Sequence, residues 1–176
     1  MQEVPLLVVI AGPIGAGKST VADLLGHRLA GLGLTTAVVD LDDVAFMQRD
    51  IAPQKLWRRG AIAATALVRG WFDAKTDAVI AHGPFFEAGG HELLLGGQQP
   101  NVQVRHVLLR VSYETALVRV AGDPLRGASK NPEFLKSTHE RFRTLEASLP
   151  SPDFYFDTEA SLAKDIASDL AAALTQ

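Results

Sequence analysis

The stretch that decides the fold is AGPIGAGKST, residues 11–20, which directly follows the apolar run VPLLVVI at residues 4–10. It satisfies the pattern G-x-x-x-x-G-K-[ST] at every fixed position, with Gly12, Gly17, Lys18 and Ser19. Glycines let the backbone curl so that successive N–H groups point at phosphate oxygens, and the helix that follows adds its positive N-terminal end. Lys18 is then expected to reach the β- and γ-phosphates, and the Ser19 hydroxyl to contact Mg²⁺. The sequence therefore predicts that this loop binds a nucleoside triphosphate.

The sequence on both sides of the loop supports this interpretation. An apolar run precedes it, and Val21, Leu24, Leu25 and Leu29 follow at helical spacing. A glycine-rich turn with an incidental lysine would need neither of these neighbours, whereas the nucleotide-binding motif requires a strand before it and a helix after it. The predicted nucleotide-binding residues of the loop are Gly12, Pro13, Ile14, Gly15, Ala16, Gly17, Lys18, Ser19 and Thr20.

Short apolar runs alternate with helical patterns along the chain, which is typical of a parallel sheet covered by helices. Several of these runs lack strict alternation, as expected of strands buried on both faces. Leu56, Ala63, Leu67 and Trp71 indicate a long helix that begins at Pro53. The predicted strands are Val4–Ile10, Thr36–Asp40, Asp77–His82, Val104–Val111 and Asp153–Phe156.

Length and composition exclude several classes of protein. The 176 residues suit a single domain, residues 1–176, with a substantial core. Without any cysteine, disulfides, thiol catalysis and Cys-ligated metals are excluded. A net charge of −3 gives no reason to expect a nucleic acid as partner. No stretch approaches the roughly 20 apolar residues needed to cross a bilayer, so we expect no membrane association and a cytoplasmic location.

Two classes of triphosphate-binding protein fit the sequence poorly. A GTPase would need a guanine-reading Asn-Lys-x-Asp near the fifth strand, and the sequence has none. A motor or transporter-type ATPase would usually end an apolar strand with Asp or Glu, to hold Mg²⁺ and orient water. The third predicted strand ends in His82 instead. This weakens the hydrolase hypothesis.

Three features together define a resemblance: the loop, the acidic cluster Asp40-Leu41-Asp42-Asp43 after the second strand, and an arginine-bearing polar segment after the fourth. With them the sequence resembles the small P-loop kinases, such as adenylate kinase, shikimate kinase, gluconate kinase and chloramphenicol phosphotransferase, over nearly its whole length. The resemblance implies a three-layer α/β P-loop NTPase fold, with a five-stranded parallel sheet, helices on both faces and a mobile lid at about residues 121–134. It also implies an ATP-dependent kinase that uses Mg²⁺ to transfer the γ-phosphate to a hydroxyl of a small molecule, either a metabolite or an antibiotic.

The acidic cluster supplies the candidate catalytic carboxylates. Ligands sit at the carboxyl ends of parallel strands, so Asp40 is expected to point toward the phosphates and the metal. By the resemblance, an aspartate here accepts the proton of the substrate hydroxyl or supports Mg²⁺ together with Ser19. Asp40 and Asp42 share one side of an extended chain and could divide these tasks, and which of them is the base stays open. Asp43 is expected to cap the next helix.

The polar segment supplies the candidate lid cations. By the resemblance, Arg119 stacks on the adenine and Arg126 closes over the β- and γ-phosphates, where a guanidinium would balance the charge on the transferred phosphoryl group. Lys130 is a weaker candidate. The turn FDTEAS, residues 156–161, is expected beside the adenine ring, unless Asp157 or Thr158 caps the last helix.

The acceptor site is expected between the loop after the second strand, the helices that follow and the end of the third strand. Arg58 and Arg59 are adjacent on a helix, so at most one of them can face a pocket. His82 is a candidate partner of the acceptor hydroxyl, although a structural role is the stronger expectation. The other candidate lining residues are Phe46, Met47, Arg49, Trp57, Phe85, Phe86 and Glu87, of which Trp57, Phe85 and Phe86 fit a core or interface role better.

Two alternatives stay open beside the small-molecule kinase. One is a nucleoside or nucleotide kinase, which would need a base-reading pocket and arginines near residues 49–59. The other is a regulatory ATP-binding protein without an acceptor, which would need neither the lid nor the acidic cluster. The identity of the acceptor and the oligomeric state are not determined by the sequence.

Overall fold

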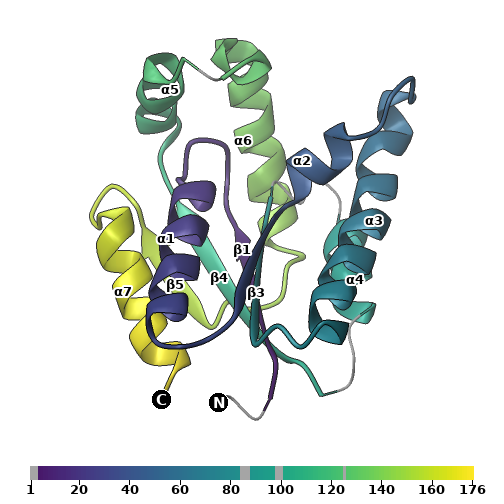
Figure 1. Cartoon of the computed structure of the whole chain (residues 1–176). Helices are drawn as coiled ribbons and strands as arrows, with labels where there is room; N and C mark the ends of the chain where they lie inside the picture. Colours follow the sequence, from purple (N-terminus) through teal and green to yellow (C-terminus); the bar gives the residue numbers. More distant parts are fainter. Residues whose placement is uncertain (1–3, 84–87, 98–100, 125) are drawn as a thin grey trace.

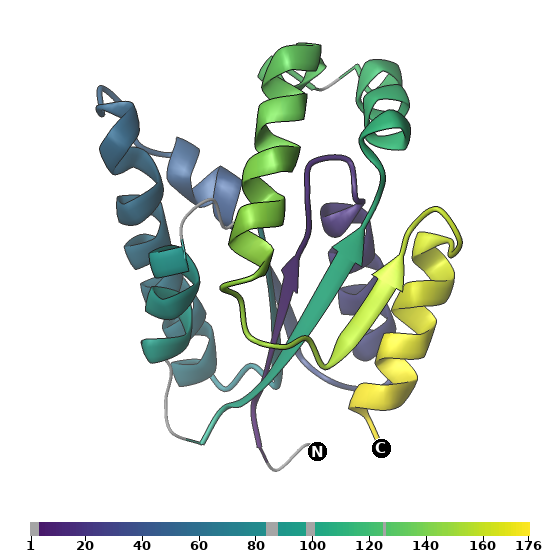
Figure 2. The same cartoon turned by 180° about the vertical axis from the view of Figure 1, so that it is seen from behind.

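The structure is a computed structural model that describes residues 4–83, 88–97, 101–124 and 126–176. Five parallel strands form one sheet in the order β2-β3-β1-β4-β5, and helices cover both of its faces (Figures 1 and 2). The predicted three-layer α/β fold is therefore confirmed. The strands are β1 (Leu6–Ala11), β2 (Thr36–Asp40), β3 (Ala78–His82), β4 (Gln103–Arg110) and β5 (Phe154–Asp157). The helices are α1 (Lys18–Gly31), α2 (Leu41–Phe46), α3 (Pro53–Asp73), α4 (Ala88–Gly96), α5 (Tyr113–Gly122), α6 (Pro132–Glu146) and α7 (Ala163–Leu174).

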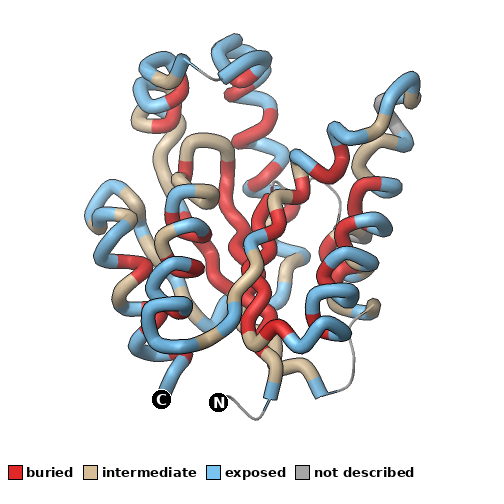
Figure 3. Tube along the Cα trace, viewed as in Figure 1, coloured by how far each residue is buried: buried red, intermediate tan, exposed pale blue. Residues whose placement is uncertain are grey.

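The central strand β1 is buried on both faces, which explains its unbroken apolar sequence. Leu6, Val8 and Ile10 pack in a core with α1 and α7, whereas alternate residues such as Leu7 and Val9 pack in a second core with α3, α4 and α6. Figure 3 shows this burial as a continuous band along the strands and the inner faces of the helices. The two cores hold the sheet rigid between the helical layers, so its carboxyl edge is a fixed platform.

The carboxyl ends of the strands meet at that edge, where the candidate residues lie. In the sheet register, His82 lies opposite Ile10 on one side and opposite Asp40 on the other. The loop that follows β1 therefore begins beside the end of β3, and the acidic cluster begins one strand further along. This is the position where ligands bind in open parallel sheets.

Strand positions agree with the prediction to within two residues, and β2 agrees at both ends. Asp77, predicted as the first residue of the third strand, precedes it. Its carboxylate accepts hydrogen bonds from the backbone N–H of Thr35 at 2.8 Å and from the Thr35 hydroxyl at 2.7 Å. These bonds tie together the starts of β2 and β3 and lower the pKa of Asp77.

The long helix α3 begins at Pro53 as predicted, but it buries a different face. Leu67 and Trp71 are exposed. The side chains that pack toward the sheet are Ala61, Ala64, Val68 and Phe72. The small side chains of Ala61 and Ala64 allow close packing on the buried face. The larger residues Leu67 and Trp71, from which the helix was predicted, therefore do not mark that face.

The segment predicted as a loop at residues 121–134 is partly helical. It holds the end of α5, a 3₁₀ turn at Ala128–Lys130 and the start of α6.

The alternative that Asp157 or Thr158 caps the last helix is wrong, because Leu162 occupies the N-cap of α7. Asp157 instead accepts a hydrogen bond from the backbone N–H of Glu159. Among the described residues, no helix is both long enough and apolar enough to span a membrane.

Candidate functional site

The glycine-rich loop joins β1 to α1 and has the conformation that the motif requires. Gly15 and Gly17 both have positive φ, and Gly17 is the N-cap of α1. A Cβ on Gly15 would lie 2.8 Å from Cβ of Ala116 on α5, so the loop and that helix touch where no side chain fits. Ile14, Gly15 and Gly17 are half-buried, and Ala16 is buried. The backbone N–H groups of the first turn of α1, which begins at Lys18 after the N-cap Gly17, thus lie at the helix N-terminus, where unpaired donors and the helix dipole favour an anion.

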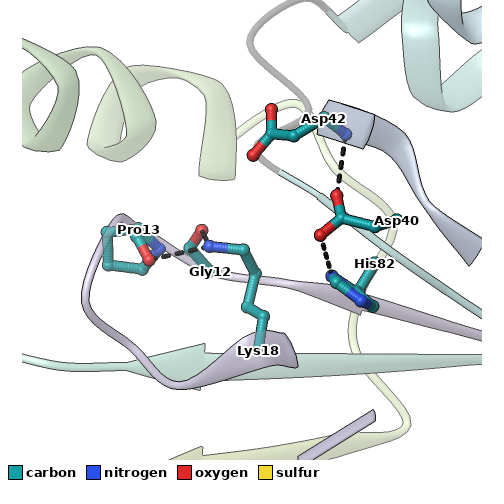
Figure 4. Close-up of polar contacts among 6 residues, drawn as sticks. All are labelled: Gly12, Pro13, Lys18, Asp40, Asp42 and His82. Atoms are coloured by element: carbon teal, nitrogen blue, oxygen red, sulfur yellow. Dashed lines mark hydrogen bonds and ion pairs between the residues drawn. The ribbon is translucent and has the colours of Figure 1, made fainter. Parts of the chain in front are cut away.

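Lys18 bridges the loop from inside. Its Nζ donates to the carbonyl oxygens of Gly12 and Pro13, each at 2.9 Å (Figure 4). Burial lowers the pKa of Lys18 to about 8, while the charge of Asp42 raises it and that of Arg126 lowers it. The ammonium group is therefore held at the loop and lies within electrostatic range of both the acidic cluster and the lid segment.

The two hydroxyl residues of the motif lie in the first turn of α1. Ser19 is half-buried and Thr20 is exposed. Hydroxyl and carboxylate oxygens are the donors that Mg²⁺ prefers, and this ion is commonly held by one or two protein ligands together with phosphate oxygens. Among the described residues, no group of three or more His, Cys, Asp or Glu could hold a metal by itself. Ser19 and one aspartate are enough to hold a Mg²⁺ ion that is also bound by phosphate oxygens. They are too few to hold a metal by protein ligands alone.

Asp40 ends β2 and is the N-cap of α2, with its Oδ1 accepting from the backbone N–H of Asp42 at 2.8 Å. Two sequence expectations are therefore wrong. Asp43 does not cap the helix, and Asp40 and Asp42 do not share an extended segment, because the chain turns into α2 immediately after Asp40. The cap holds the backbone of Asp42 in place, so Asp40 positions the second aspartate.

His82, at the end of β3, lies beside Asp40. Its Nδ1 is 3.8 Å from Asp40 Oδ2, and the histidine is 4% exposed (Figure 4). Burial lowers the pKa of His82, although the Asp40 carboxylate opposes this. This imidazole lies against the side of Asp40, and its contact with an acceptor hydroxyl stays a prediction.

Asp42 has the most perturbed carboxylate of the site. Burial raises its pKa to about 6, and the neighbouring charge of Asp40 raises it further, whereas Lys18 and Arg126 lower it. Figure 4 shows its side chain directed away from Asp40 and His82. A carboxylate that is half-buried near two cations, with a pKa close to neutrality, has the properties of a general base.

Arg126 lies in the lid segment, and its Nε is 3.2 Å from Asp123 Oδ2. The two side chains are exposed enough for this pair to contribute little to stability. Because the charge of Arg126 affects the pKa of both Lys18 and Asp42, its guanidinium lies within electrostatic range of the loop. Lys130 is exposed in the 3₁₀ turn, where its backbone N–H donates to the Gly127 carbonyl at 3.0 Å.

Arg119 links three segments at the other side of the loop. Its Nη1 donates to the Gly15 carbonyl at 3.1 Å and to the Thr158 hydroxyl at 2.9 Å, and its Nη2 donates to the Thr158 carbonyl at 2.7 Å. Thr158 in turn donates to the Arg110 carbonyl at the end of β4. The arginine thus lies between the P-loop and the turn after β5, the region that the sequence predicts to contact adenine.

His139 on α6 is a contact of the loop that sequence reasoning missed. Its Nε2 lies 2.8 Å from the carbonyl oxygen of Ile14, its ring packs edge-on against Tyr113, and it is 8% exposed. A carbonyl can only accept, so Nε2 carries the proton. The signal was present, since Leu135, Thr138, His139 and Phe142 share the buried face of an amphipathic helix.

A hollow of about 600 Å³ lies behind the loop, between the end of β4, the start of α5, and α6. It is lined by residues such as Pro13, Arg110, His139 and Arg143, and it reaches none of Lys18, Asp40 or Asp42. It is therefore separate from the carboxylates at the end of β2.

The structure describes three of the arginines predicted for the acceptor site, and they differ in their contacts. Arg49 caps the end of α2, with Nη1 donating to the carbonyl oxygens of Phe46 at 2.6 Å and Gln48 at 3.1 Å. Arg58 and Arg59 are exposed on α3, about 100° and 200° around the helix from Trp57, so Arg59 points to the opposite side. Phe85, Phe86 and Glu87 lie outside the described residues.

With the strand order, the P-loop and the lid segment in place, the chain has the fold of the P-loop small-molecule kinases. It is similar to shikimate kinase from Acinetobacter baumannii in complex with shikimate, at 19% identity and a TM-score of 0.59, over 99% of this chain and 94% of the other. The tunicamycin resistance protein of Deinococcus radiodurans is 18% identical with a TM-score of 0.66, over 97% and 95%. A sugar kinase from Janibacter sp. HTCC2649 is 21% identical with a TM-score of 0.68, over 97% and 95%. No family model and no curated protein matches the sequence.

Proposed function

We propose that this protein is an ATP-dependent kinase that transfers the γ-phosphate to a hydroxyl group of a small molecule. The observation that carries the proposal is the placement of the glycine-rich loop and the acidic cluster at one edge of the sheet, where the ends of β1 and β2 lie on either side of His82. The charges of Asp42 and Arg126 both act on the pKa of Lys18. A protein that merely bound ATP would not need a half-buried carboxylate with a raised pKa beside the phosphate-binding lysine.

Asp42 acts as the base in this proposal. The acceptor oxygen forms a bond to the γ-phosphorus, the bond between that phosphorus and the β–γ bridging oxygen breaks, ADP leaves, and the hydroxyl proton passes to the Asp42 carboxylate. A pKa of about 6 keeps this carboxylate ionised at pH 7.5 and still basic enough to accept a proton. Asp40, through its bond to the Asp42 backbone, is a positioning residue.

The cations supply most of the catalysis. Phosphoryl transfer depends chiefly on alignment and on neutralising charge on the transferred group. Lys18 and the loop amides bind the phosphates, and Arg126 reaches them from the lid segment. Ser19 and Asp40 would hold Mg²⁺, which supplies charge neutralisation when bound.

Arg119 fixes the other end of the nucleotide. Its bonds to Gly15 and Thr158 hold the P-loop and the turn after β5 at a set spacing, and the adenine would lie against this arginine. A planar guanidinium can stack on a base while its edge donates hydrogen bonds. We therefore assign Arg119 to nucleotide binding and Arg126 to the transferred phosphoryl group.

The test is an assay of ADP release against a panel of hydroxyl-bearing metabolites and antibiotics, with Lys18→Ala as the blank. We expect ADP release that depends on one class of acceptor and on Mg²⁺, and a phosphorylated product by mass spectrometry. Asp42→Asn should lower kcat by about 10²- to 10⁴-fold and leave MgATP binding by calorimetry intact. MgATP binding without turnover of any acceptor, together with an unaffected Asp42→Asn protein, would instead indicate a nucleotide-binding regulator.

A further inference from the structure

The outward side of α3 is apolar where a surface helix is normally polar. Ile62, Leu67 and Trp71 are 51%, 41% and 42% exposed, and the exposed residues between them are small, apart from Arg69. The outer face of α3 is defined here by its exposed apolar residues Ile62, Ala63, Ala66, Leu67, Gly70 and Trp71. A contiguous apolar surface that is exposed on a folded protein is typical of an interaction site.

Neighbouring elements contact α3 on its other sides. Helix α2 packs at Gly60, where an added Cβ would lie 2.7 Å from Cβ of Ala45. Helix α4 packs at Ala61, whose Cβ would lie 3.7 Å from a Cβ on Gly90. At about 100° per residue, Ala66 lies about 120° around the helix from Gly60 and about 140° from Ala61. Figure 1 shows α3 at the edge of the molecule, so its outer face is accessible to a second molecule.

The sequence along this face is complementary to itself about Ala66. Arg59 and Asp73 are each seven residues from Ala66, and Ile62 and Gly70 are each four residues from it. All four lie within about 40° of Ala66 around the helix. A second α3 that is antiparallel to the first, with a two-fold axis at Ala66, therefore places Arg59 opposite Asp73 and Ile62 opposite Gly70. A Cβ at Gly70 would meet nothing within 4 Å, which leaves room for the Ile62 side chain of the other copy.

The charges on α3 favour the antiparallel direction. Lys55, Arg58 and Arg59 are exposed near the start of the helix. An antiparallel pair brings these cations beside the C-terminal end of the other helix, which carries partial negative charge. A parallel pair would instead place Arg59 against Arg59. The antiparallel pair also brings the two Leu67 side chains together on the same side of the axis, where their burial is favourable.

We propose that two copies of this chain form a dimer through the outer face of α3, with the helices antiparallel and Ala66 at the two-fold axis. Such an interface uses the same surface of both copies, so its steric and charge matches must lie on a single helix, as they do here. Small residues at the crossing point let the two helices approach closely. The proposal is independent of the proposed kinase function, because the outer face faces away from the sheet and the candidate site.

The first experiment uses the absence of cysteine from the chain, which lets one introduced cysteine report on its own position. Ala66→Cys should form a disulfide-linked dimer under mild oxidation, because the two copies of residue 66 meet at the axis. Lys55→Cys is the matched control, since this exposed residue lies within about 20° of Ala66 around the helix. The two copies of residue 55 would be about 33 Å apart along the helices, far beyond the Cα separation of a disulfide. Equal crosslinking of both variants, or none in Ala66→Cys, would overturn the antiparallel dimer.

The second experiment needs no cysteine. The wild-type protein should sediment as a dimer, and dissociate on dilution. Ala66→Arg places two cations at the axis and should give a monomer with an unchanged melting temperature at low protein concentration and an unchanged Kd for MgATP. Leu162→Arg, at an exposed apolar residue before α7, is the control and should stay dimeric.

Two sedimentation results would reject the proposal. A wild-type protein that stays monomeric at every concentration would show that the outer face of α3 does not bind a second copy. A dimer that persists in Ala66→Arg would place the interface elsewhere on the molecule.

Discussion

His139 Nε2 donates a hydrogen bond of 2.8 Å to the carbonyl oxygen of Ile14, and so joins α6 to the P-loop across 125 positions of sequence. The helix that contains His139 begins at Pro132, directly after its N-cap Asn131, and the 3₁₀ turn at Ala128–Lys130 directly precedes that cap. Burial lowers the pKa of His139, so the ring is neutral at pH 7.5 and holds its single proton at Nε2. The glycine-rich loop is therefore held by a hydrogen bond from α6, the helix that directly follows the segment containing Arg126.

We predict that His139→Phe weakens MgATP binding about fivefold, because one neutral hydrogen bond is worth about 1 kcal/mol and the Ile14 carbonyl would lose its donor. His139→Gln, whose amide can donate to the same carbonyl, should restore most of the affinity. The measurements are Kd by calorimetry and the separate values of KM and kcat. Equal losses in both variants, in step with their melting temperatures, would show that His139 only fills space.

A second prediction concerns the pH dependence of kcat/KM for MgATP, which reports ionisations in the free enzyme. The rate should fall below pH about 6, as Asp42 gains a proton, and above pH about 8, as Lys18 loses its charge. The two limbs belong to an interacting pair and are measured as macroscopic values. Asp40→Asn should move the acidic limb to lower pH, because the charge of Asp40 raises the pKa of Asp42. An acidic limb unchanged in both Asp40→Asn and Asp42→Asn would remove Asp42 from the mechanism.

Asp42→Asn should stabilise the fold while lowering kcat. The pKa of Asp42 is raised in the folded protein, so between pH about 4 and about 6 the folded state keeps a proton that the unfolded state has released. The free energy of unfolding therefore falls as pH rises through this range. Above pH about 6 the loss is complete and stays constant. We expect the variant to gain about 1–2 kcal/mol in free energy of unfolding at pH 7.5 and nothing below pH 4. Urea denaturation at both pH values measures this.

Gly15→Ala should disrupt the loop, since φ is +84° and the new Cβ would lie 2.8 Å from Cβ of Ala116. We expect MgATP binding to be lost and the melting temperature to fall by several degrees. Gly31→Ala is a matched substitution at the end of α1, where an added Cβ meets nothing within 4 Å, and it should be neutral or slightly stabilising. Wild-type nucleotide affinity in Gly15→Ala would contradict the close contact between the loop and α5.

The sequence predicted the loop and the five-stranded parallel sheet well because both depend on local signals. The motif has fixed spacings between Gly12, Gly17, Lys18 and Ser19. Five short apolar runs that alternate with helical patterns are typical of a parallel sheet. The cap of α2 was predicted at the wrong aspartate, because a helix of six residues has too little periodicity to show where it begins. The helical face of α3 was misjudged since the contact with Ala45 and the sheet selects small residues, which a hydrophobic pattern ranks low.

Contacts between distant segments were beyond the reach of sequence patterns. The bond of Arg119 to Thr158 joins residues 39 positions apart, and that of His139 to Ile14 joins residues 125 positions apart. Each depends on how α5 and α6 cross the carboxyl edge of the sheet. Asp42 was named as a candidate base from its place after β2, but its preference over Asp40 follows from burial and from the capping bond, which need coordinates.

The central place of β1 has a consequence for how the chain is made. β1 pairs with β3 on one side and with β4 on the other, so Leu6–Ala11 is synthesised before both of its partners and stays uncovered at its edges until residues 78–110 have been made. Closing such long loops slows folding, and an uncovered apolar strand is prone to pair with other chains. A nascent chain stalled before β4 should therefore depend on chaperones, and the loop after β1 reaches its final surroundings only when β4 has been made, although its own residues are translated about 90 positions earlier.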